Sequence, residues 1–172
     1  MSNNLDSVTV ATIYSLTDGE PYVGIPPILP AIVPVTLIDR DSGLQPPKAG
    51  QVSVASLNPG TDHHGIDNVF LQFVFNRVNE NTYTLTVNGL HVVARRGRLF
   101  ASVYGPPEQF RITYAERHNA YIIQKTDGPS GWVAPIDEEN RQILIRPLIV
   151  GPSEPPFYPS TQLFRFVISD EE

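Results

Sequence analysis

The sequence predicts an all-β fold, and two observations lead to that class. The chain has 172 residues and 17 prolines, about twice the usual ~5% share. Proline is excluded from helix interiors and is confined to turns, loops and strand edges. The longest proline-poor stretch, Gln72 to Tyr104, alternates apolar with polar residues and is rich in β-branched side chains, without a 3.6-residue period.

The apolar residues fall in about twelve short runs with turn signals between them, which is typical of a β-sandwich or a β-barrel. The expected strands span residues 8–15, 22–25, 33–39, 69–78, 81–87, 90–95, 98–104, 110–117, 120–125, 131–135, 142–150 and 162–169.

An internal repeat distinguishes between these architectures. Three segments begin alike, VATIY, ENTYT and HNAYI, and place Ile13, Tyr83 and Tyr121 at matching positions. Each segment continues through a glycine-containing turn (TDG, VNG or TDG) into a second short strand. Repetition at a fixed period is the signature of an architecture built from equivalent units.

A second element also recurs three times, as LQFVFNRV, EQFRITYA and QLFRFVIS, and matches Phe73, Phe110 and Phe164. Three copies of about four strands predict a β-trefoil, in which a six-stranded barrel is capped by three hairpins around one shared core. A sandwich with accidental similarity is the alternative. The residues expected to line or flank the core are Phe73, Val74, Tyr83, Phe110, Ile112, Tyr121 and Phe164.

The repeat predicts a single β-trefoil domain over residues 1–172, in which the first unit is overlong. A loop insertion at about residues 40–68 accounts for the extra length, with QVSVASL as a candidate extra strand. Loops of this length are uncommon in compact domains unless they have a use.

Composition excludes several functional classes. A net charge of −6 and a pI near 5.1 argue against nucleic-acid and anionic-membrane partners, which need a broad basic field. The absence of cysteine excludes disulfides and thiolate chemistry. The N-terminus lacks the pattern of a signal peptide, and no apolar run is long enough for a membrane helix. We therefore expect a cytoplasmic protein, or one released by an unconventional route.

The C-terminal half resembles a known family. NAYII, GWVAP and LIVGPSEPP, which fall within residues 118–168, are similar to motifs of the fungal β-trefoil serine-protease inhibitors of the cospin (mycospin) group. The resemblance implies tight inhibition of trypsin-like enzymes through an exposed loop, with no cofactor and no catalytic residue. It also implies that different members use different loops of one scaffold, as do the related cysteine-protease inhibitors of mushrooms.

The usual reactive residue of that family does not transfer to this sequence. In cospin-like members it is an asparagine in the loop between the second and third strands. Here that loop is GIPPILPAIVPV, residues 24–35, and it contains no Asn, Lys or Arg. The protease contact is therefore expected either in another loop or through different residues of this one.

The first candidate is the turn that contains Arg95, Arg96 and Arg98. A trypsin-like specificity pocket holds a buried carboxylate, with which an inserted arginine makes a charge-assisted bidentate pair. The alternative is a solvated turn whose cationic side chains deter edge-to-edge strand pairing.

The second candidate is the proline-rich loop 25–34, in which Leu29, Pro30, Ala31 and Ile32 are the proposed contact residues. Such a segment is stiff and extended and suits the small apolar pocket of an elastase- or subtilisin-like protease. The alternative is a buried connector that packs on the barrel. A third proline-rich loop, 151–160, matches the family motif but is a weaker candidate.

Two other functions have weaker support in the sequence. Asp62, His63, His64 and Asp67 contain metal-binding groups, but a polar insertion is the simpler explanation and no metal is expected. A carbohydrate-binding β-trefoil lectin is the main alternative to an inhibitor, with Trp132 and Asp127 or Asp137 as the sugar site. The Gln-x-Trp motif of ricin-type lectins is absent, and Trp132 lies in an apolar run typical of the core.

Overall fold

A computed structural model describes residues 8–25, 31–38, 71–136, 141–152 and 156–168. These residues form thirteen β-strands and two short 3-10 turns, without an α-helix, which confirms the predicted all-β class. The expected insertion at 40–68 lies outside the described residues.

The first seven strands are β1 (Val8–Ser15), β2 (Tyr22–Gly24), β3 (Ile32–Pro34), β4 (Thr36–Ile38), β5 (Gln72–Asn79), β6 (Thr82–Val87) and β7 (Leu90–Arg95). The rest are β8 (Arg98–Ser102), β9 (Gln109–Ala115), β10 (Ala120–Lys125), β11 (Ser130–Val133), β12 (Leu144–Pro147) and β13 (Phe164–Ile168). The 3-10 turns are η4 (Glu116–His118) and η5 (Ser160–Gln162).

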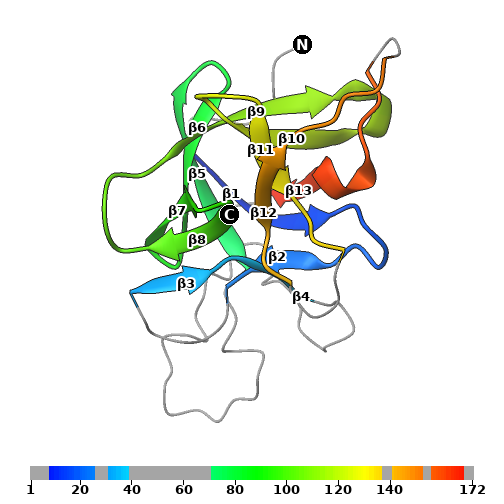
Figure 1. Ribbon diagram of the computed structural model, residues 1–172. Coiled ribbons are helices and arrows are strands. Elements are labelled where there is room, and N and C mark those ends of the chain that lie inside the picture. The colour runs from blue at the N-terminus through cyan, green and yellow to red at the C-terminus, as the bar shows by residue number, and fades with distance from the viewer. Residues whose placement is uncertain (1–7, 26–30, 39–70, 137–140, 153–155, 169–172) are drawn as a thin grey trace.

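Six strands close into a ring of antiparallel pairs. β1 pairs with β5, β5 with β6, β6 with β9, β9 with β10, β10 with β13, and β13 again with β1. A closed ring has no free edge, so the barrel offers no unpaired strand for aggregation. Figure 1 shows these strands wrapped around a common centre.

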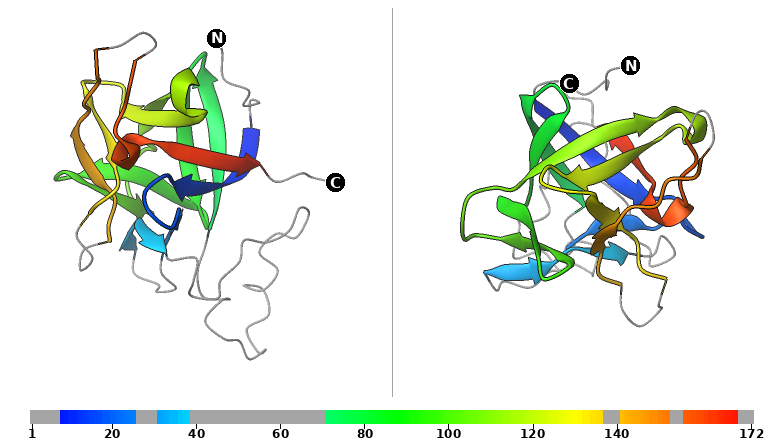
Figure 2. Two further views of the ribbon diagram at one scale, coloured as in Figure 1. Left: turned by 90° about the vertical axis from the view of Figure 1, so that its right-hand side faces the viewer. Right: turned by 45° about the horizontal axis from the view of Figure 1, so that its top comes forward.

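The remaining strands cover one end of this barrel. β2 pairs with β4, β7 with β8, and β11 with β12, and the first strand of each pair also contacts the preceding barrel strand. The pairs are joined by β3 to β8, by β8 to β12, and by a bridge from Thr36 to Gln142. The three hairpin units therefore form a cap, visible from two sides in Figure 2.

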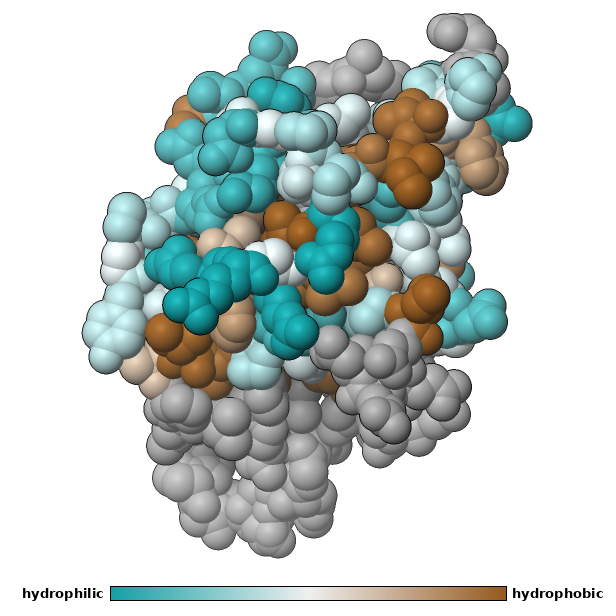
Figure 3. Space-filling model, viewed as in Figure 1, coloured by the Kyte–Doolittle hydropathy of each residue, from teal (hydrophilic) through white to brown (hydrophobic). Residues whose placement is uncertain are grey.

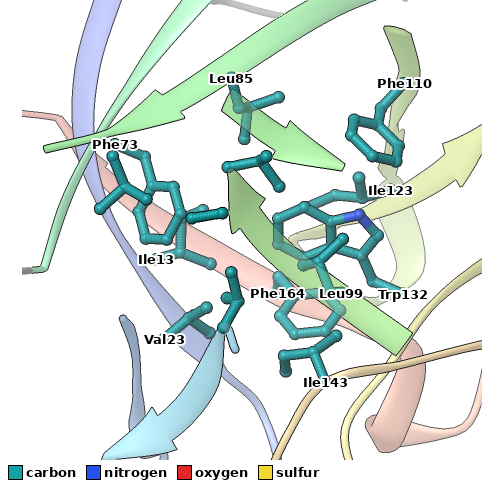
Figure 4. Close-up of a cluster of buried hydrophobic side chains, with 14 of the residues drawn as sticks. Ile13, Val23, Phe73, Leu85, Leu99, Phe110, Ile123, Trp132, Ile143 and Phe164 are labelled. Atoms are coloured by element: carbon teal, nitrogen blue, oxygen red, sulfur yellow. The ribbon is translucent and has the colours of Figure 1, made fainter. Parts of the chain in front are cut away.

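One core fills the barrel and extends under the cap. Trp132 is fully buried, and its ring packs edge-on against Phe110 and Phe164 at centroid distances of 5.7 and 5.8 Å (Figure 4). Burying large aromatic side chains is strongly favourable, and truncating one to alanine in a core costs about 3–5 kcal/mol. The sequence repeat thus supplies one buried phenylalanine from each unit to a shared centre.

The predicted core is largely confirmed. Phe73, Tyr83, Phe110, Ile112 and Phe164 have no exposed surface. Tyr121 and Val74 are only half-buried, and Tyr121 packs at the edge of the core.

Two expected strands differ from the structure because of proline. The run 33–39 was expected as one strand, but β3 pairs with β8 while β4 pairs with β2. Pro34, at the change of partner, has no N–H to donate. The run 142–150 was expected as a strand to Val150, but β12 ends at Pro147.

Two other strands end earlier in the chain than the sequence predicts. β8 stops at Ser102 rather than at 104, because the Ser102 hydroxyl accepts the Tyr104 N–H at 2.9 Å and a left-handed Gly105 follows. β9 stops at Ala115 rather than at 117, where η4 begins. Side-chain bonds to backbone compete with strand pairing at such positions.

Candidate functional site

The three clustered arginines lie at the tip of the β7–β8 hairpin. Arg95 ends β7, Arg98 begins β8, and Arg96 and Gly97 form the two-residue connection with φ angles of 53° and 78°. Two positive φ values in a two-residue loop are those of a type I′ turn, the connection that matches strand twist. All three arginine side chains are exposed.

The β12 strand holds this turn in place. The Gly97 carbonyl accepts hydrogen bonds from the Ile145 N–H at 2.8 Å and from Arg146 Nη1 at 3.0 Å. Arg98 pairs with Arg95 on one side and with Leu144 on the other. The turn is therefore preorganised without a disulfide.

The turn concentrates positive charge in an acidic protein. Arg146 is also exposed, so four arginines gather around the hairpin tip. None of the ion pairs found in the described part of the chain includes any of the four. Figure 3 shows strongly hydrophilic side chains over β7, β8 and β12. The hairpin tip therefore presents a cluster of positive charge at the surface.

Backbone geometry limits how the arginines meet a protease. Substrate-like binding needs an extended residue whose own N–H and carbonyl are available to the enzyme. Arg96 is left-handed, and Arg95 and Arg98 belong to paired strands. The turn therefore presents side chains rather than a substrate-like backbone, and its role in binding stays a prediction.

The second predicted loop is described only in part, because Leu29 and Pro30 lie outside the described residues. Ala31 accepts the Val103 N–H at 3.0 Å, and Ile32 pairs with Ser102. The Ile32 side chain is 44% exposed. Ile32 and the arginine turn therefore lie at opposite ends of β8, about 13 Å apart at 3.3 Å per residue.

An apolar segment that the sequence pattern assigned to a strand is exposed to solvent in the structure. Ile149 and Val150 were expected at the end of a strand, but they lie beyond β12 and are 64% and 54% exposed. The following Gly151–Pro152 pair is the sequence signal for a turn here. This segment directly precedes the third proline-rich loop, 151–160.

Trp132 is not placed to bind a sugar. Trp132 has no exposed surface and packs in the core, so its ring is unavailable for stacking on a sugar. Asp127 lies 3.9 Å from the Lys125 ammonium, and Asp137 lies outside the described residues. The structure therefore does not favour the lectin alternative at Trp132.

Four residues with metal-binding groups, for which the sequence favours a polar insertion, lie outside the described residues: Asp62, His63, His64 and Asp67. Within the described ranges, no three His, Asp or Glu side chains gather closely enough to hold a metal ion. The same ranges contain no helix of the length and hydropathy needed to cross a bilayer.

The closed barrel with rigid projecting turns defines the chain as an all-β scaffold that presents loops. The chain belongs to the peptidase inhibitor I66 family, whose model matches residues 53–168. It is 51% identical over 61 residues to a serine protease inhibitor of Lentinula edodes, an alignment that covers 34% of this chain and 42% of the relative. The matched part thus spans less than half the length of that curated relative.

Solved structures share the fold. A proteinase inhibitor from Coprinopsis cinerea superposes with a TM-score of 0.69 at 24% identity, over 95% of this chain and 99% of the inhibitor. A Polyporus squamosus lectin bound to a sialylated glycan superposes with a TM-score of 0.57 at 13% identity, over 95% of this chain and 50% of the lectin. At these identities the likeness establishes the fold alone.

Proposed function

We propose that this protein is a non-enzymatic inhibitor of serine proteases, built as a single β-trefoil domain with an insertion at about 40–68. Membership of the peptidase inhibitor family supports the function, as does the 51% identity to a serine protease inhibitor. The ring of six barrel strands, the cap of three hairpin units and the threefold sequence repeat support the trefoil.

The rigid cationic turn is the observation that supports a specific contact site for the protease. Arg96 lies at its tip, and the Gly97 carbonyl beside it is held by two hydrogen bonds from β12. An arginine side chain that enters a carboxylate-bearing pocket makes a bidentate, charge-assisted pair. The partner we propose for this turn is a trypsin-like protease.

Preorganisation explains how a short turn provides useful affinity. Association costs several kcal/mol in lost freedom, and ordering a loop adds to that cost. Strand pairing and the β12 contacts have already ordered the backbone of this turn. Only the arginine side chain then loses freedom on binding, so most of the contact energy is retained.

A trypsin inhibition assay tests this site. Arg96→Ala should weaken inhibition by about 30-fold or more, which corresponds to the ~2 kcal/mol of an interface hot spot. Arg111→Ala is the matched control, because Arg111 is an exposed arginine on the barrel strand β9. It should inhibit as the unchanged protein does.

The assay distinguishes failure of the proposed inhibitory function from failure of the arginine turn as the contact site. If trypsin, subtilisin and elastase all retain full activity at micromolar protein, the proposed function is wrong. If trypsin is inhibited equally by the unchanged protein and by the Arg96→Ala, Arg95→Ala and Arg98→Ala variants, the arginine turn is not the contact.

A further inference from the structure

The loop after β12 exposes apolar side chains at the surface. Ile149, Val150 and Phe157 are 64%, 54% and 47% exposed. The loop projects beside the β9–β10 turn at the upper right of Figure 1, and Figure 3 shows strongly hydrophobic surface in the same place. Exposed apolar surface on a rigid projection is typical of a partner contact.

A buried glutamine fixes the backbone of Ile149. Gln162 is 2% exposed, and its Oε1 accepts the Ile149 N–H at 2.7 Å while its Nε2 donates to the Ile149 carbonyl at 2.9 Å. One amide side chain therefore satisfies both backbone groups of a residue whose own side chain points to solvent. Such a clamp restrains the chain without covering it.

Hydrogen bonds also hold Gly151, two residues after Ile149. Gly151 donates to the Phe157 carbonyl at 2.6 Å, and the Phe157 N–H approaches the Gly151 carbonyl at 3.5 Å. A Cβ on Gly151 would lie 3.1 Å from Phe157 Cβ and 3.2 Å from its carbonyl oxygen. Glycine therefore allows the two arms of the loop to approach closely.

The outer arm is anchored on the η4 turn. His118 Nε2 accepts the Tyr158 N–H at 3.0 Å, and the His118 ring lies 5.2 Å from the Phe157 ring. The Arg117 guanidinium lies 5.6 Å from the same phenyl ring. The Phe157 arm, and Gly151 with it, is thus supported by the barrel.

Val150 lies between Ile149 and Gly151, and its own backbone polar groups are not hydrogen-bonded to any described residue. Neither its N–H nor its carbonyl makes a hydrogen bond within the described part of the chain. In substrate-like binding, the residue that fills the primary specificity (S1) pocket offers its carbonyl to the oxyanion hole and its N–H to the enzyme backbone. The arrangement therefore leaves free the backbone groups that a protease needs, and restrains the residues on both sides.

We propose that Val150 fills the S1 pocket of a serine protease and that the Val150–Gly151 peptide bond lies at the catalytic serine without being hydrolysed. This inference rests on the proposed inhibitory function and adds a second contact loop to it. The S1 pocket must be small and apolar, as in elastase-like enzymes, because valine is short, β-branched and uncharged. The rigid flanks hold the bond in place and oppose its separation after attack.

A specificity switch tests the proposal. In an Arg96→Ala background, which removes the predicted trypsin contact, Val150→Arg should reduce elastase inhibition by about 100-fold and create trypsin inhibition. Val167→Arg is the matched control, because Val167 is a similarly exposed valine on β13. This variant should alter neither elastase inhibition nor trypsin inhibition. Because Val150 is exposed and unbonded, the substitution should leave folding intact.

Loss of the clamp gives a second, chemical readout. Gln162→Ala should turn the inhibitor into a substrate of elastase. Hydrolysis would add one water across the Val150–Gly151 bond and leave a carboxylate on Val150 and an amine on Gly151. Intact-mass spectrometry after incubation with elastase should find these two fragments.

The outcomes distinguish this inference from the proposed function. If trypsin is inhibited through Arg96 but elastase keeps full activity, the function stands and the Val150 assignment is wrong. The assignment is also wrong if Val150→Arg leaves elastase inhibition unchanged. If neither enzyme nor subtilisin is inhibited, the function and the inference both fail.

Discussion

At the scale of single residues, Tyr121 is a side chain whose ionisation the fold perturbs. Its ring stacks on Phe166 at a centroid distance of 4.5 Å and lies 5.4 Å from the Tyr114 ring. Burial raises the pKa of the Tyr121 hydroxyl above its ordinary value of 10.0, with smaller contributions from Tyr114 and Tyr83. Desolvation disfavours the charged phenolate.

This shift predicts a loss of stability in alkali. The unfolded chain releases the Tyr121 proton near pH 10, whereas the folded chain holds it to higher pH. The contribution is therefore complete below about pH 10 and is lost as the pH rises through the folded value. Tyr121→Phe removes the titration, so urea denaturation between about pH 9 and pH 11 should show a shallower loss of stability.

The exposed Tyr104 supplies the control. Tyr104→Phe removes a hydroxyl that is exposed to solvent, and its urea denaturation is measured over the same pH range. Identical slopes for the Tyr121→Phe variant and the unchanged protein would show that the fold does not hold this proton.

At the scale of elements, the β7–β8 turn depends on Gly97. Its φ of 78° is left-handed, and a Cβ there would lie 2.9 Å from Arg146 Nη1. A left-handed non-glycine residue costs about 1–2 kcal/mol, and displacement of Arg146 adds to this. Gly97→Ala should therefore lower the free energy of unfolding by about 1–2 kcal/mol in a denaturant titration.

Gly128→Ala is the comparison for that experiment. Gly128 has no atom within 4 Å of the added Cβ and no positive φ, so the variant should be close to neutral. Equal effects at Gly97 and Gly128 would mean that the arginine turn is not conformationally restrained.

At the scale of the whole molecule, the sequence predicted the strands well because the pleat imposes a period of two on buried residues. The repeat also brought Phe73, Phe110 and Phe164 to one core, as expected. Strand ends were less predictable, because they depend on local bonds such as Ser102 to Tyr104. The domain boundaries and the insertion remain predictions.

The site was harder to predict than the fold. The sequence indicated an arginine turn, and the exposed hairpin tip is observed, but its left-handed Arg96 was not foreseeable from the run ARRGR. Ile149 and Val150 were missed because LIV has the composition of a strand. The clamp from Gln162 is thirteen residues away along the chain and leaves no mark in the local pattern.

The central claim is that the folded protein blocks serine proteases through preformed loops. The most direct measurement titrates a fixed amount of active-site-counted trypsin or elastase with the protein and follows hydrolysis of a small substrate. We predict that activity falls linearly and reaches its minimum near one molar equivalent. Full activity of both enzymes at a tenfold molar excess would contradict the account.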